Sequence, residues 1–406
     1  MEKADFYREA RYDIPGPLNG IRVLELTTSW AGPMCACLMA DLGADVIKVE
    51  APDGEVTRKL APFFAPRIGY LYATVNRNKR SLTLDLHEPE AREIYLKIAA
   101  RSDVVVQNFR PGTLDRWGIG YEDVRRVKPD IVYVSISGFG QWGPDHDRAA
   151  YDPLAEAESG FMSLNGSPDG PPVKAANYLC DDLSGLHGAL SALAALRHRD
   201  QTGEGQHIDV ALLDAMLFQS NGMLTLGAIG YPLQRNGNRS NFTSPSEVFR
   251  CKDGSVYLYV LLDTHWRKVA ALMGRPEVGT DPHYATAVAR VAHHGEVEAM
   301  VAEWMAERTA KEVLADFARE GVPAAPVRTY PEAACDPHVL ARDMLHETAH
   351  EGGMTVPITA PAAKFSRTPL RIRNSAPALG AHNDEILAGV GIDAEARARL
   401  RSSKLI

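Results

Sequence analysis

Two adjacent carboxylates, Asp181 and Asp182, stand at the start of a stretch rich in Ala and Leu that has the composition of one long helix, residues 181–199. A carboxylate at a helix start can cap the helix by accepting backbone N–H hydrogen bonds. It can also act as a nucleophile, and the N–H groups there favour negative charge. From the residues alone the cap is the more common role, and the two roles are compatible.

Other residues that could do chemistry are less specific. Arg110 and Arg116 follow a strand-like run, and guanidinium groups suit phosphate oxygens, although ordinary surface charge is the alternative. The 13 histidines show no metal-ligand spacing, and His146 is expected at the surface. The sequence contains no G-x-x-x-x-G-K-[ST] loop, no G-x-S-x-G elbow and no H-E-x-x-H, and no G-x-G-x-x-G follows the first strand. These absences argue against several familiar enzyme classes.

The elements that must position these residues alternate between strands and helices. Buried strands are predicted at 21–26, 45–50, 81–86, DVVVQNF and DIVYVSIS, and helices at 32–42 and 88–100. This alternation predicts a mostly parallel, doubly wound α/β sheet, in which ligands lie beyond the carboxyl ends of the strands. Small residues at Gly185, Gly188 and Ala192 should let the long helix pack closely against a neighbour.

The second half of the chain has a different pattern. Residues 231–245 are polar and read as a linker, and Asp253-Gly254 predicts a hairpin within FRCKDGSVYLYV. Amphipathic helices are expected at 266–273, 297–305 and 310–319, and a short one at 384–387. These elements predict a smaller α+β unit.

Composition sets further limits. A total of 44 Lys and Arg against 52 Asp and Glu gives a net charge of -8, which argues against a nucleic-acid partner. Five scattered cysteines suit neither a disulfide framework nor a metal site. Neither a secretory signal nor a run of about 18 apolar residues is visible, so no membrane association and a cytoplasmic location are expected.

Five segments carry a family resemblance through their order and spacing. They are AGPMCACLMADLGADVIKVEAP, NRNKRSLTLDL, QNFRPGTLDRWGIGYEDV, YDPLAEAESGFM and YLCDDLSGLHGALSALAALRHRDQTGEGQHIDVALLDAM. Together they closely resemble the class III CoA-transferase family, which includes the formyl-CoA and carnitine CoA-transferases. The likeness extends to GVPAAPV and to LGAHNDEIL near the end.

The resemblance implies a nucleophile and a CoA site. The family's catalytic aspartate lies four residues before a glycine, which falls on Asp181 here, with Asp182 as the neighbour that could be mistaken for it. The reaction implied is transfer of CoA from an acyl-CoA, such as succinyl-CoA, to a small carboxylic acid through an aspartyl anhydride and an aspartyl-CoA thioester. CoA enters as part of a substrate, so no separate cofactor and no metal is expected. The implied CoA contacts are Trp30, Ala31, Leu84, Asp85, Leu86, His87, Asn108, Phe109, Arg110, Arg116, Ala149, Ala150, Tyr151 and Asp152.

The resemblance also implies an architecture. Residues 1–225 would form the first part of a large Rossmann-like domain, 226–245 a linker, 246–328 a small domain, and 329–406 a linker with the C-terminal return to the large domain. Two copies would form an interlocked homodimer.

Departures from the family pattern limit the substrate. Formyl-CoA transferases carry Gln where this chain has Trp30, and Arg where it has Ala51, and their Gly-rich substrate loop is not recognisable here. Formyl and oxalate specificity is therefore not expected. Arg235, Arg239 and His265 are candidates for meeting a second carboxylate of the substrate.

Three alternatives stay open. An α-methylacyl-CoA racemase would need a second acid/base group, and the corresponding position holds Tyr151, whose phenol is a poor base at neutral pH. His146 could take that role only if its loop folds inward. Non-catalytic acyl-CoA binding would not require Asp181, and a CoA hydrolase would act without an acceptor acid.

Overall fold

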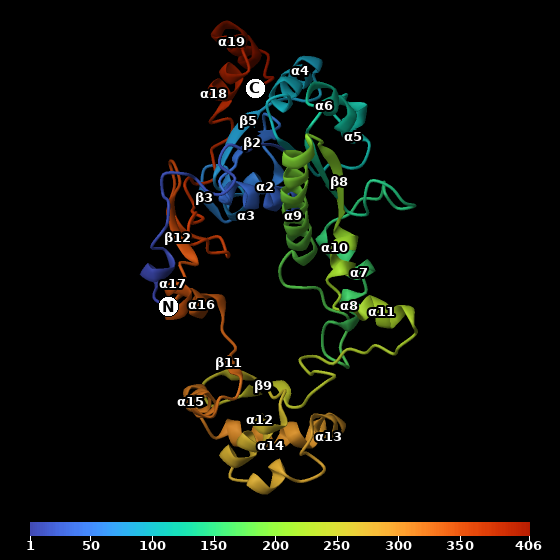
Figure 1. Ribbon diagram of the computed structural model, residues 1–406, viewed down its shortest axis with the longest axis vertical. Helices are drawn as coiled ribbons and strands as arrows, with labels where there is room; N and C mark the ends of the chain where they lie inside the picture. The colour runs from blue at the N-terminus through green and yellow to red at the C-terminus, as the bar shows by residue number, and fades with distance from the viewer. The chain divides into compact units, whose positions relative to one another are not determined.

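A computed structural model describes all 406 residues. The chain forms two compact units (Figure 1). The first comprises Met1–Phe161, Lys174–Ile229 and Pro337–Ile406, and the second comprises Met162–Val173 and Gly230–Asp336. The finer domain boundaries expected from the sequence stay a prediction.

A six-stranded parallel sheet organises the first unit. Its strands are β1 (Arg22–Leu26), β2 (Asp45–Glu50), β5 (Lys79–Thr83), β6 (Val104–Gln107), β7 (Val132–Ser137) and β8 (Gln206–Ala211). They lie in the order β5-β2-β1-β6-β7-β8. This is the 3-2-1-4-5-6 order of the doubly wound nucleotide-binding fold, which confirms the predicted sheet. The direction of winding reverses between β1 and β6, where such folds leave a crevice.

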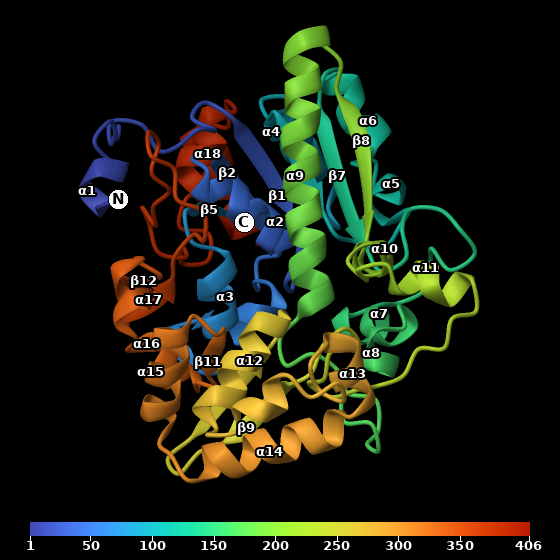
Figure 2. The same cartoon turned by 60° about the horizontal axis from the view of Figure 1, so that its bottom comes forward.

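Alternating strand residues feed two separate cores. Val23 and Val104 point to the face covered by α2 (Ala31–Asp41) and α9 (Leu179–Thr202). Leu24 and Val105 belong to the opposite face, which is covered by α4 (Pro89–Ala99), α6 (Tyr121–Val127) and α18 (Asn383–Gly389). Both faces are buried, as the continuous apolar runs predicted. Figure 2 shows α9 running alongside the sheet next to α2.

The small-residue face of α9 packs against α2, as predicted. A Cβ placed on Gly185 would lie 2.8 Å from Met34 Cγ, and one on Gly188 would lie 3.0 Å from Cys35 Sγ. Only glycine permits this approach. The N-termini of the two helices lie together, since Trp30, just before α2, is bonded to Asp182 in the first turn of α9.

Several boundaries differ from expectation. The long helix begins two residues earlier and ends three residues later than predicted, and the strand expected at 81–86 ends at Thr83, which leaves residues 84–86 in the following turn. Elements of the first unit that the sequence did not reveal include the helices α3 (Tyr70–Val75), α5 (Thr113–Arg116), α7 (Asp152–Glu158) and α19 (Ala394–Ser402), and the hairpins β3 (Phe63–Ala65) with β4 (Ile68–Gly69) and β12 (Leu345–Ala349) with β13 (Thr355–Thr359). The unit also contains α1 (Lys3–Phe6), η1 (Val56–Lys59), α10 (Leu212–Phe218), α11 (Met223–Ala228) and α17 (Pro337–Ala341), while α8 (Phe161–Leu164) begins at its edge.

The second unit is an antiparallel sheet covered by helices. Its strands β9 (Ser246–Arg250), β10 (Ser255–Tyr259) and β11 (Ala324–Pro326) lie in the order β11-β10-β9, which confirms the predicted hairpin. The helices are α12 (Asp263–Leu272), η2 (Pro276–Gly279), α13 (Ala287–Ala292), α14 (His294–Ala306), α15 (Ala310–Glu320) and α16 (Tyr330–Ala334). Trp266 and Phe317 are buried at the centre of its core. No helix of either unit combines the length and apolar character needed to cross a membrane.

Candidate active site

A cavity of about 210 Å³ opens in the first unit beyond the carboxyl ends of β1, β6 and β7. This is the reversal point of the sheet, where α/β folds bind ligands. Its lining residues are Thr28, Ser29, Trp30, Ala31, Asn108, Phe109, Arg110, Pro111, Ile136, Ser137, Gly138, His146, Arg148, Ala149, Ala150, Tyr151, Asp181 and Leu212. Asp181 is the one acidic residue among them.

The structure separates the two neighbouring carboxylates. Asp181 is the third residue of α9, so it is not the helix cap. Asp152 takes that role from another helix: its Oδ1 accepts hydrogen bonds from the backbone N–H groups of Cys180 (2.7 Å) and Asp181 (3.2 Å). Asp182 Oδ1 instead accepts a hydrogen bond from Trp30 Nε1 at 2.6 Å, and Asp182 does not line the cavity. Asp181 is therefore the carboxylate available to a ligand.

The surroundings of Asp181 change its acidity. Burial raises the pKa of Asp181 to about 7, and the negative charges of Asp152 and Asp182 act in the same direction. A carboxylate with a pKa near 7 is a stronger base and nucleophile than an ordinary one, and it is still substantially ionised at neutral pH. The helix N-terminus lends partial positive charge to the same place.

Asn108 joins the two loops that flank the reversal point. Its Oδ1 accepts a hydrogen bond from the Thr28 backbone N–H at 2.9 Å, and its Nδ2 donates to the Thr28 carbonyl at 2.8 Å. Nearby, the Gln107 Oε1 atom accepts from the Phe109 N–H at 2.7 Å. Asn108 thus fixes the loop after β1 to the loop after β6 and supports the cavity as well as lining it, while Gln107 orders the second loop.

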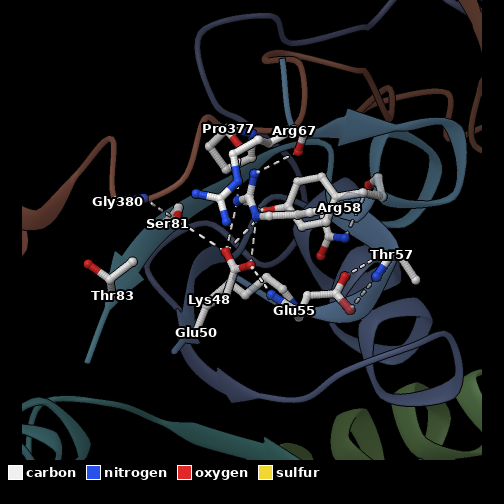
Figure 3. Close-up of polar contacts among 12 residues, drawn as sticks. Lys48, Glu50, Glu55, Thr57, Arg58, Arg67, Ser81, Thr83, Pro377 and Gly380 are labelled. Carbon is white, nitrogen blue, oxygen red and sulfur yellow. Dashed lines mark hydrogen bonds and ion pairs between the residues drawn. The ribbon is translucent and has the colours of Figure 1, made fainter. Parts of the chain in front are cut away.

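Buried charges hold the loop after β1 from its other side through Glu55. Figure 3 shows Glu55 beside the buried pair of Glu50 and Arg58. Glu50 accepts hydrogen bonds from Arg58 Nε and Nη2 at 2.7 and 2.8 Å, and it also accepts from the Glu55 N–H at 3.3 Å. Glu55 Oε2 in turn accepts from Thr28 Oγ1 at 3.1 Å and from the Ser29 N–H at 3.2 Å. Burial acts to raise the pKa of Glu50, but the hydrogen bond and charge of Arg58 hold it below its ordinary value. The loop that carries Trp30 therefore rests on a buried ion pair.

The structure brings together most, but not all, of the residues predicted to contact CoA. Nine of the predicted site residues line the cavity: Trp30, Ala31, Asn108, Phe109, Arg110, Ala149, Ala150, Tyr151 and Asp181. Six do not: Leu84, Asp85, Leu86, His87, Arg116 and Asp152. Leu84 and Leu86 are buried in the core next to α4, and Asp152 is 3% exposed and bonded to the start of α9.

An aromatic track connects part of the second group to the cavity. The Trp117 ring lies 5.7 Å from the ring of Phe109, which lines the cavity, and 5.2 Å from the ring of His87. Arg116 immediately precedes Trp117, and Asp85 Oδ1 lies 3.0 Å from His87 Nδ1. Trp117 was not among the predicted site residues, although an aromatic residue next to a candidate phosphate-binding arginine was a signal for it.

Other lining residues were also missed. Ser137 and Gly138 follow β7, and the rule that ligands lie beyond strand ends could have found them. A Cβ on Gly138 would lie 2.1 Å from that of Ala150, so the glycine lets the 149–151 loop close onto the strand end. Arg148 also lines the cavity, but it is held by Glu158 at 2.5 Å and Asp145 at 3.2 Å.

The residues suggested for a second carboxylate lie in the other unit. Arg239 Nη2 pairs with Glu298 Oε2 at 2.7 Å, and Arg235 donates to the carbonyls of Ser163, Ser167 and Gly170. Both guanidinium groups are therefore already engaged within that unit. His146 lines the same cavity as Asp181, but it is exposed, as expected from the sequence, and its Nδ1 lies 2.9 Å from the Gly143 carbonyl oxygen.

Comparison with known proteins identifies the class of this chain. The model of CoA-transferase family III matches residues 18–383. The chain belongs to that family, and it is an enzyme of the CoA-transferase class, which overturns the alternative of a binding protein without turnover.

Individual relatives agree over nearly their whole length. The succinate–glutarate CoA-transferase of Agrobacterium fabrum is 38% identical over 383 residues, which cover 92% of this chain and 95% of that protein. The succinyl-CoA:mesaconate CoA-transferase of Haloarcula hispanica is 37% identical over 388 residues, covering 93% and 97%. Among solved structures, a CAIB/BAIF family protein from Brucella suis superposes with a TM-score of 0.84 at 35% identity, covering 93% of this chain and 100% of that one.

Proposed function

We propose that this CoA-transferase uses Asp181 as its nucleophile and exchanges CoA between small dicarboxylic acids, with succinyl-CoA as a donor. One observation carries the proposal: Asp181 is the only acid in the cavity at the reversal point of the sheet, and it is held there without serving as the helix cap. The raised pKa suits a nucleophile that must also leave again.

The reaction divides into balanced steps. A carboxylate oxygen of Asp181 attacks the thioester carbonyl, the C–S bond breaks, and CoA leaves as a thiolate from a mixed anhydride. The thiolate attacks the aspartyl carbonyl, which releases the donor acid and leaves aspartyl-CoA. The acceptor carboxylate attacks that thioester to form a second anhydride and expel the thiolate. The thiolate then attacks the acceptor's acyl carbonyl, which yields the new acyl-CoA and restores the Asp181 carboxylate.

The N-terminus of α2 supports this chemistry because Ala31, its first residue, lines the cavity in which the negative intermediates would form. At the start of α9 the N–H groups of Cys180 and Asp181 are bonded to Asp152, so that helix contributes its dipole alone. Arg110 lines the cavity and suits an anionic group of the substrate, while Arg148 is already paired. The track from Phe109 through Trp117 to His87 suits the adenine end of CoA, with Arg116, Asp85 and the flanking leucines around it.

The choice of dicarboxylic acids rests on the relatives. Their names specify succinate with glutarate, mesaconate, L-malate or D-citramalate. These are short acids with two carboxylates. The acceptor of this enzyme belongs to the same chemical class in our proposal, and an assay of these acids with succinyl-CoA would rank them.

One observation favours a second activity. His146 and Asp181 line the same cavity, His146 from an exposed loop, so an imidazole and a carboxylate border one space, and 1,1-proton transfer uses two acid/base groups. Exchange of the α-proton of a 2-methylacyl-CoA in D2O, abolished by His146→Ala, would support racemisation. The absence of exchange alongside rapid CoA transfer would leave transfer as the sole activity.

The decisive experiment is chemical trapping. Wild type and the variants Asp181→Ala and Asp182→Asn are incubated with succinyl-CoA, treated with hydroxylamine or borohydride, and measured by intact-protein and peptide mass spectrometry. We expect modification at residue 181 in wild type and Asp182→Asn, and none in Asp181→Ala. Modification at residue 182, or transfer by Asp181→Ala at the wild-type rate, would refute the assignment.

We also propose that the enzyme works as an interlocked homodimer in the cytoplasm, as its family membership suggests. Multi-angle light scattering should give twice the 44.3 kDa chain mass. Dissociation to active monomers on dilution would contradict interlocking, because threaded chains cannot separate without unfolding.

A further inference from the structure

The side chain of Asp182 is committed to Trp30. Trp30 Nε1 donates to Asp182 Oδ1 at 2.6 Å, and Asn177 Nδ2 approaches Asp182 Oδ2 at 3.4 Å. The Trp30 ring also lies 5.6 Å from the ring of Tyr178 at an interplanar angle of 55°. The indole is thus held by the hydrogen bond of its N–H and by contact with the Tyr178 ring.

This contact joins two parts of the chain that are 152 residues apart. Trp30 is the residue before α2 and lines the cavity, whereas Asp182 lies in the first turn of α9 next to Asp181. An indole has only two side-chain torsions and a single hydrogen-bond donor, so one charge-assisted bond at Nε1 restricts the whole ring. The ring is therefore a fixed apolar wall beside the proposed nucleophile.

A wall at this place matters for chemistry. The mixed anhydride is open to attack by water, which would release the acid and return Asp181 without transfer to an acceptor. An apolar ring beside the carboxylate occupies space that water would otherwise fill, and water exclusion prevents such side reactions. The position of Trp30 should therefore decide how acyl groups divide between acceptor and water.

We propose that Asp182 is a positioning residue that fixes the Trp30 indole as a water-excluding wall beside Asp181, and so favours CoA transfer over hydrolysis. This inference rests on the proposed function of Asp181. A charge-assisted hydrogen bond favours the held rotamer by a factor of about ten or more. Its loss should therefore raise the ratio of hydrolysis to transfer by about tenfold.

The test measures both fates of succinyl-CoA at saturating acceptor, as free CoA released by hydrolysis and as new acyl-CoA formed. Asp182→Ala and Trp30→Phe remove the acceptor and the donor of the same bond, so each should raise the hydrolysis-to-transfer ratio about tenfold. The double variant should raise it no further than either single variant, because the bond can be lost only once. Asp182→Asn keeps an oxygen acceptor but loses the charge, so its hydrolysis-to-transfer ratio should lie between those of wild type and Asp182→Ala, which separates the hydrogen bond from the charge. Because Asn has the shape of Asp, this variant also guards against misfolding of the alanine variant.

Unchanged partitioning in Asp182→Ala and Trp30→Phe, even with lower kcat, would overturn the proposal, as would effects that multiply in the double variant. A failure of the proposed function is distinguishable, because trapping would then find no adduct at Asp181 in wild type.

Discussion

Replacing Asp181 by Asn removes a charge from a place where the protein disfavours it, so the variant should lose activity and gain stability. Burial and the neighbouring carboxylates raise the pKa of Asp181 to about 7 in the folded enzyme, while an unfolded Asp has its ordinary value near 3.9. Between these pH values the unfolded chain carries the charge and the folded chain does not. Folding then takes up a proton, and stability falls as pH rises.

The size of the effect follows from the two pKa values. Each pH unit in that interval costs about 1.4 kcal/mol, and the loss levels off above pH 7. Between pH 5 and pH 8 the titration of Asp181 therefore lowers the free energy of unfolding of wild type by about 3 kcal/mol. Asp181→Asn has no titrating group at this position and lacks this decrease. With an unfolding entropy of about 2.1 cal/mol/K per residue, the Tm difference between variant and wild type should grow by about 3 °C over this range.

Thermal unfolding of both proteins from pH 5 to pH 8 measures this difference, and other titrating groups cancel in the comparison. Asp169→Asn, at an exposed position, is the matched control, and its Tm should change with pH as that of wild type does. In parallel, kcat/KM of wild type should rise with pH through about 7, because attack requires the ionised Asp181. A Tm difference that stays constant with pH, or shrinks as pH rises, would refute the reasoning.

Two further perturbations test the supports of the cavity. Asn108→Ala frees the Thr28 backbone by removing two hydrogen bonds, so KM for acyl-CoA should rise by about tenfold or more with a smaller change in kcat. An unchanged KM would show that the loop after β1 keeps its position without these two hydrogen bonds. Glu50→Gln leaves the buried guanidinium of Arg58 without a charged partner, which should lower the free energy of unfolding by about 3–5 kcal/mol and Tm by about 4–6 °C. Thermal unfolding monitored by circular dichroism measures this, and a Tm within 1 °C of wild type would contradict it.

Local patterns were enough for much of the fold. Residues 45–50 were predicted with their exact bounds because Asp45 and Glu50 flank Val46, Ile47 and Val49, an apolar run interrupted by Lys48. Asp253-Gly254 located the hairpin of β9 and β10. The glycines of α9 predicted a close contact with another helix, but their spacing does not identify α2 as that helix. The strand order also escaped local analysis, because pairing between β1 and β6 joins segments about 80 residues apart.

The site shows the same division. Residue type and family resemblance indicated Asp181, Trp30 and Asn108, but the interactions that assign their roles are long-range. The cap expected from Asp181 is supplied by Asp152, the partner of Asp182 is Trp30, and the partner of Asn108 is Thr28. None of these pairs has a spacing that a sequence pattern would detect. The same holds for the ion pair of residues 50 and 58, whose importance becomes clear only when Glu55 is seen to hold the loop after β1.

The position of the cavity follows from how the chain winds. After β1 the chain enters α2 on one face of the sheet, whereas after β6 it continues to α6 on the other face. The two loops diverge, and a crevice is left between them that Asn108 spans by binding Thr28 on both of its backbone groups. The close contact of α9 with α2 then brings a second helix N-terminus to the same crevice. That contact depends on Gly185 and Gly188, so these two glycines also determine where Asp181, in the first turn of the same helix, lies in the crevice.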